Sequence, residues 1–128
     1  MTLEQALVQT NRNMIAFDLA LGAGALFAPG PTLRLVFGHE DPTPDAERWV
    51  QRCAPIWLTF AAAHGVAARR GAPEDWWALA WLRGTEIATD AVLARSPSVT
   101  RPGARIGLVL AGAANLAMAL GFARLARR

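Results

Sequence analysis

One apolar segment, residues 76–93, carries three ionisable side chains in its interior. Arg83, Glu86 and Asp90 lie within eight residues of one another, and the segment is otherwise composed like a membrane-crossing helix of about the required length. Each such group costs about 2.5–3.5 kcal/mol to insert into hydrocarbon. A helix that keeps all three must direct them towards other protein groups or towards water. The segment therefore predicts a membrane bundle with a polar interior.

Three further apolar segments, each bounded by turn or cap residues, accompany the first. We predict an all-α fold, a four-helix transmembrane bundle with antiparallel neighbours, because the connections are short and no strand alternation appears. Residues 1–128 are expected to form a single membrane domain. Its helices are expected at about residues 12–29, 46–69, 74–94 and 102–124. A short apolar element at residues 33–37 should lie at the membrane interface, between the first two helices.

Composition and charge narrow the class of protein. The chain is 53% hydrophobic and 18% charged, against about 25% charged in an ordinary globular domain. Its mean hydropathy is only +0.23, so the membrane prediction rests on how the apolar residues are distributed. No aromatic-interleaved basic stripe is present, which argues against nucleic-acid binding. Arginines divide evenly between the two predicted sides, so the positive-inside rule sets no orientation.

Two further predictions concern the first helix and the start of the third. Asp18 interrupts the first apolar segment and Pro29 follows it, which favours an uncleaved first helix over a signal peptide. Trp76, Trp77 and Trp81 open the third helix, where indoles are expected at the level of the lipid headgroups.

Small residues recur at every fourth position of the last helix and predict close helix packing there. The stripe consists of Gly103, Gly107, Ala111, Asn115, Ala119 and Ala123.

The number of residues that separates each polar group from the nearest turn predicts which groups lie at the same depth in the membrane. The turn near residues 70–73 should place Phe60 opposite Arg83 and Trp57 opposite Glu86. The turn near residue 100 should place Asn115 beside Glu86. The first helix runs parallel to the third, so Asp18 should lie near the depth of Arg83. Arg52 and Asp90 should form a second layer nearer one surface.

Two interpretations of these layers remain open. In the structural one, Arg83 neutralises Asp18 and Glu86, and Arg52 neutralises Asp90, so that the pairs specify helix register without adding net stability. In the functional one, three acids outnumber two arginines. An acid left without a cation would be neutral, and it would exchange protons or donate a hydrogen bond to a ligand. Glu86 is the leading candidate for that role.

The remaining candidates for chemistry are sparse. His64 is expected one to two turns from the mid-depth layer, where a satisfied core residue is the simpler interpretation and a ligand or proton-relay role the alternative. No Glu-x-x-His pair or cysteine motif predicts a metal site. No nucleophile elbow, phosphate loop or nucleotide fingerprint is present, so the sequence predicts neither an enzymatic reaction nor a cofactor.

The layout of the chain resembles small four-helix bacterial membrane proteins of the DoxX-like kind and related uncharacterised families. The residues behind the likeness are Gly22 to Pro29, then Leu33 to Gly38, and the acid Asp90 late in the third helix. The resemblance implies a multi-pass protein of the bacterial inner membrane with ties to membrane redox systems. It assigns no catalytic residue.

These observations lead to three functional expectations. The first is an accessory or small-ligand-binding subunit that handles a quinone or lipid, with the bilayer, and a homo-oligomer or larger membrane complex, as partners. The second is an oligomeric proton-coupled carrier. The third is a soluble α-helical domain, which requires the last helix to be buried on all sides by a small chain.

Overall fold

The computed structural model describes all of residues 1–128 and contains five helices and no strand. The helices are α1 (Leu3–Phe27), α2 (Pro29–Leu35), α3 (Pro44–Arg70), α4 (Pro73–Arg95) and α5 (Pro102–Leu125). The all-α prediction is confirmed, and the short apolar element expected near residues 33–37 is largely the short helix α2.

Helix α1 begins at Leu3, about nine residues earlier than the sequence suggested. A capping box explains the early start: the Gln5 amide donates to Thr2 Oγ1 (3.2 Å), and the Thr2 amide donates to Gln5 Oε1 (2.8 Å). The polar residues before Met14 are therefore helical. One of them, Asn11, is fully buried.

Proline and glycine set the helix boundaries as the sequence indicated. Helix α1 ends at Phe27, its cap residue Ala28 has a φ of −141°, and Pro29 starts α2 at once. Helices α3, α4 and α5 also open on proline, where the missing N–H would have had no partner inside the helix. Gly71, with φ of +63°, ends α3 in the left-handed conformation that glycine adopts without strain.

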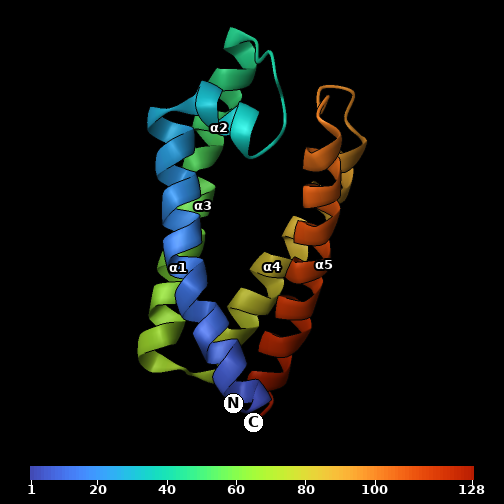
Figure 1. Ribbon diagram of the computed structural model, residues 1–128. Helices are drawn as coiled ribbons and strands as arrows, with labels where there is room; N and C mark the ends of the chain where they lie inside the picture. Colours follow the sequence, from blue (N-terminus) through green and yellow to red (C-terminus); the bar gives the residue numbers. More distant parts are fainter.

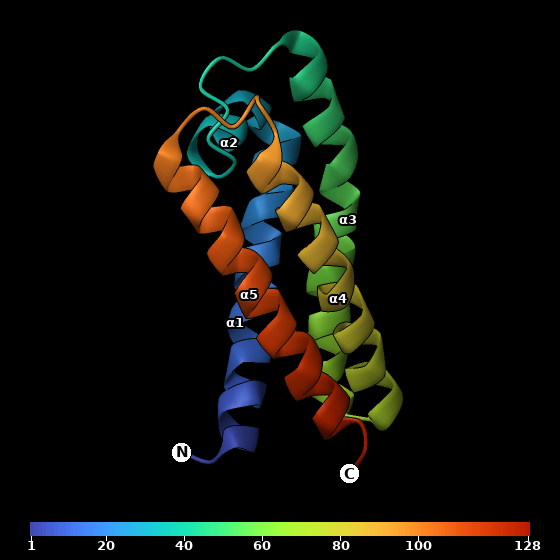
Figure 2. The same ribbon diagram turned by 90° about the vertical axis from the view of Figure 1, so that its right-hand side faces the viewer.

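The four long helices form two antiparallel pairs, α1 with α3 and α4 with α5 (Figure 1). The pairs meet at the end of the molecule that holds both chain termini, and they separate towards the end that holds α2. The view in Figure 2 shows α4 and α5 in front of α1 and α3, with N and C again at one end. At the wider end the loop before α5 joins the pairs by contacting α2 and the loop after it: the Thr100 amide donates to Gly38 O (3.2 Å), and Arg101 donates to Arg34 O (2.8 Å).

Two small apolar cores stabilise the arrangement. One lies near the termini, where the rings of Trp76 and Phe122 stack with centroids 5.7 Å apart and Leu79 is fully buried. The other lies inside the first pair and under α2; it consists of Ala25, Leu33, Val50 and Ala54. Trp76 is thus a core residue whose indole donates to Gly71 O (3.0 Å), whereas Trp77 and Trp81 are exposed.

An ion pair closes the turn between α3 and α4. Arg70 donates to both Asp75 oxygens (2.5 and 3.1 Å), and the Ala72 amide donates to Asp75 Oδ2 (3.2 Å). The hydrogen bond from Arg70 is the main reason that the pKa of Asp75 lies below its usual range. Asp75 therefore caps the start of α4 as a carboxylate.

The small-residue stripe on α5 is only partly a packing surface. Asn115 is buried and the three alanines of the stripe are half-buried, but Gly103 and Gly107 are exposed, and a Cβ added at either would meet nothing within 4 Å. Close packing occurs instead at Gly112 and Gly121, where an added Cβ would touch Asp90 and overlap Leu7. The contact face of α5 is therefore rotated relative to the predicted stripe at its N-terminal end.

We expect Gly22→Ile to weaken the α1–α3 pair. An added Cβ would lie 2.7 Å from Leu58 Cδ2 and 3.3 Å from the Ala54 carbonyl oxygen, and overpacking of this kind costs about 1–3 kcal/mol. Unfolding of the purified protein measures the loss. Gly107→Ile is the matched control and should be tolerated, because its site is open. Equal stability of the two variants would show that α1 and α3 do not approach this closely.

Candidate functional site: a buried polar cluster

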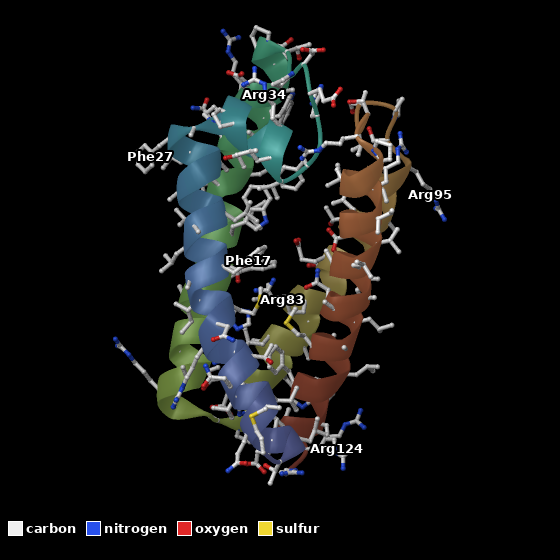
Figure 3. All side chains as sticks on the ribbon, viewed as in Figure 1. Phe17, Phe27, Arg34, Arg83, Arg95 and Arg124 are labelled. Atoms are coloured by element: carbon white, nitrogen blue, oxygen red, sulfur yellow. The ribbon has the colours of Figure 1, made fainter.

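Arg83 links three helices from a position that is only 2% exposed. From α4 it forms an ion pair with Asp18 on α1, and it donates to His64 Nε2 on α3 from Nε (3.0 Å) and Nη2 (2.6 Å). Its guanidinium carbon lies 5.2 Å from the centre of the Phe60 ring. Figure 3 shows the side chain between the two helix pairs. The predicted pairing of Arg83 with Asp18, and the predicted facing of Phe60, are confirmed.

The contacts of His64 define its tautomer. A guanidinium has donors only, so Nε2 must carry the lone pair that accepts from Arg83. Nδ1 then carries the proton and donates to Asn11 Oδ1 at 2.6 Å, while Asn11 Nδ2 returns a hydrogen bond to the His64 carbonyl oxygen at 3.1 Å. His64 is therefore a neutral bridge between Arg83 and Asn11. We call Asn11, Asp18, His64 and Arg83 the polar cluster.

The polar cluster leaves one acceptor unsatisfied. Asp18 is fully buried, and its Oδ2 accepts from Arg83, but Oδ1 has no hydrogen-bond partner. A buried acceptor without a donor costs about 1–3 kcal/mol, and it is the one place in the cluster where a proton or a ligand hydroxyl would form a new hydrogen bond.

A second polar group lies farther along α4. Asp90 is buried and accepts from Asn115 Nδ2 on α5 at 2.9 Å. Glu86 lies between this pair and Arg83, is half-buried, and forms no ion pair. It is within electrostatic range of Asp90, Arg83 and Asp18, and the indole of Trp57 lies near it. Trp57 and Glu86 are therefore neighbours, as their positions in the chain predict.

Two predicted pairings are wrong. Arg52 is exposed and forms no ion pair with Asp90, because α3 and α4 have separated at that level (Figure 1). Asn115 bonds Asp90 and not Glu86, one turn from the expected partner. The offset arises because side chains on a helix lean towards its N-terminus. On antiparallel helices the two side chains therefore lean towards each other along the helix axis. Two residues that bond each other then have Cα atoms at different heights along the axis, and residues whose Cα atoms are level need not be partners.

Asn11 and His64 contribute more to the cluster than the sequence predicts. Asn11 belongs to neither of the predicted polar layers, and His64 is expected one to two turns away from the group that it joins. A signal for Asn11 is present in the sequence: it precedes Asp18 by seven residues, or two helical turns, so both lie on one face of α1. His64 is misplaced because the long Arg83 side chain extends back towards the start of α4.

The chemistry available to these residues is hydrogen bonding and proton exchange. The set contains three carboxyl groups, one guanidinium and one neutral imidazole. Asp18, Arg83 and His64 form one bonded group, Asp90 is bonded to Asn115, and Glu86 belongs to neither group. No three His, Cys, Asp or Glu side chains converge in an arrangement that could hold a metal ion.

Comparison with known proteins adds no assignment. No protein family matches the chain, and searches of curated proteins and of solved structures found no match either.

We expect Arg83→Ala to lower the free energy of unfolding by about 3–5 kcal/mol, because it leaves the Asp18 charge buried and uncompensated. The double variant with Asp18→Asn should recover part of that loss. Equilibrium unfolding of the purified protein measures both changes. Arg95→Ala is the control, since Arg95 is exposed and unpaired and should change stability by less than about 0.5 kcal/mol. If Arg83→Ala matches this control, the polar cluster does not tie the helices together.

Proposed function

We propose that the protein is embedded in a membrane and serves there as an accessory subunit that binds a small amphiphile such as a quinone or lipid. The observation that carries the proposal is an inverted distribution of polarity. Three of the five largest fully buried side chains are polar, namely His64, Asn11 and Asp18. Large apolar side chains are instead exposed on all four long helices, as is normal where the solvent is hydrocarbon.

Helix α5 provides the clearest case of apolar exposure. Its most apolar stretch has a mean hydropathy of 1.9, yet only 22% of that stretch is buried. By length and composition α5 is the one helix suited to cross a membrane. The proposal extends the membrane to the other long helices because they also expose large apolar residues. These include Phe17 on α1, Ile56 on α3, and Trp81 and Val92 on α4.

A soluble domain fits these observations poorly. That alternative requires the last helix to be buried on all sides, whereas Ile106, Val109, Leu110 and Leu120 of α5 are each more than 60% exposed. In water, such a surface would be an association site or an aggregation hazard.

The proposed ligand site is the polar group around Glu86. Glu86 has no cation partner, Trp57 offers an aromatic surface beside it, and the Asp90–Asn115 pair lies on the same side of α4. A ligand with a polar head and an apolar body matches acceptors flanked by apolar helix surface. The resemblance to DoxX-like families points to the same class of ligand and remains a prediction.

We expect the expressed protein to sediment with membranes and to resist alkaline carbonate extraction, because its exposed apolar side chains would otherwise contact water. Immunoblotting of the membrane and soluble fractions measures the partition. A soluble domain of similar size, expressed in the same cells, is the control. Recovery of a stable monomer in detergent-free buffer would overturn the membrane proposal.

One observation favours a proton-coupled carrier as the second candidate. Around the single buried guanidinium lie three carboxyl groups, Asp18, Glu86 and Asp90, and one buried oxygen of Asp18 has no partner. Three negative charges beside one positive charge are unfavourable in a medium of low dielectric, so the group is expected to hold at least one exchangeable proton.

We expect Glu86 to hold that proton, because it is half-buried, Asp90 repels its charge and Arg83 is already paired with Asp18. Infrared titration should show the signal of a protonated carboxyl group, and Glu86→Gln should remove it. Glu74→Gln is the matched control, since Glu74 is exposed at the start of the same helix.

Proton flux into liposomes separates the two candidate functions. Flux that depends on Glu86 supports the carrier. A Glu86 signal that shifts on addition of a short-chain quinone, without flux, supports the ligand-binding subunit. If Glu86→Gln changes neither the infrared spectrum nor the stability, the residue has no role in either.

A further inference from the structure

An apolar groove lies on the outer surface between the N-terminal half of α1 and the C-terminal half of α5. Its volume is about 650 Å³, and its walls include Leu7 and Met14 from α1 and Ala114 and Ala117 from α5. At its narrow part Gly121 approaches Leu7 so closely that a Cβ on Gly121 would overlap the leucine side chain. The small side chains along α5 leave room for an extended hydrocarbon chain to lie against that helix.

A single positive charge marks one end of the groove. Arg124 lines it at the end where the chain termini lie, and Figure 3 shows Arg124 at this end of the molecule. Arg124 is exposed and forms no ion pair, because the nearby acid Glu4 is paired with Arg128. The charge is therefore available to an anion outside the protein.

The length of the groove matches one leaflet of a bilayer. Its α1 wall runs from Leu3 to Met14, which is about 16 Å at the helical rise of 1.5 Å per residue. Half of a typical hydrocarbon core is about 15 Å.

We propose that this groove holds one acyl chain of an anionic phospholipid, with the headgroup phosphate on Arg124. The inference rests on the proposed membrane location and adds a lipid site separate from the polar group around Glu86. Apolar walls hold the chain, and the unpaired guanidinium selects the anionic headgroup.

Native mass spectrometry of the reconstituted protein tests the proposal. The protein is placed in nanodiscs of equal amounts of phosphatidylcholine and phosphatidylglycerol, released in mild detergent, and assayed for retained lipid. We expect one retained phosphatidylglycerol in preference to phosphatidylcholine. Arg124→Gln should reduce its retention about fivefold, the effect of one basic residue near an anionic surface.

Two tryptophan variants of α5 test the groove itself. Ala117→Trp should fill the groove and abolish retention of the lipid. Val109→Trp is the matched control, because Val109 is exposed on α5 outside the groove, and it should retain lipid like the unmodified protein. Equal retention of the two lipids, or full retention by both Ala117→Trp and Arg124→Gln, would overturn the groove proposal. If the protein resists carbonate extraction, either of these results leaves the membrane proposal standing. If the protein fails the extraction test, the membrane proposal and the groove proposal are both overturned.

Discussion

The burial of one guanidinium governs how the helix pairs fit together. A positive charge in a medium of low dielectric is tolerated only with charged or hydrogen-bonding partners, and Arg83 finds them on two other helices. Helices α1 and α4 have no backbone-level contact, so the ion pair between Asp18 and Arg83 spans the space between the pairs. The apolar core near the termini, where Ala67 of α3 and Leu7 of α1 pack with Trp76 and Phe122, and the Gly38–Thr100 contact at the far end hold the same two pairs together.

The polar cluster also connects the charge of Arg83 to the positions of side chains on other helices. His64 accepts from Arg83 and donates to Asn11, and Arg83 also pairs with Asp18, so one guanidinium positions hydrogen-bonding groups on three helices. Glu86 lies one turn from Arg83 on the same helix, where its protonation would alter the field at the cluster. A ligand or proton at Glu86 would therefore change the electrostatic potential at Arg83, where the two helix pairs are joined. The proposed lipid groove lies elsewhere, on the outer surface of α1 and α5.

Much of the fold could be predicted from the sequence. Prolines at the start of α3, α4 and α5 and Gly71 at the end of α3 place the boundaries within about two residues of those predicted. Phe60 was predictable as a neighbour of Arg83 because α3 and α4 stay close near their turn, and Asp18 was predictable because α1 runs parallel to α4. The partner of Arg52 was not, because that pairing depends on two helices remaining together far from their turn.

The sequence by itself determined that several ionisable residues must be buried among helices, because apolar segments of this length leave them no other place. Which residues become partners was decided only by the tertiary structure. The reach of Arg83 towards His64, the inward face of Asn11 and the separation of α3 from α4 depend on side-chain direction and on helix crossing. Both are set by packing between segments distant in the chain, and neither follows from the local pattern of residues.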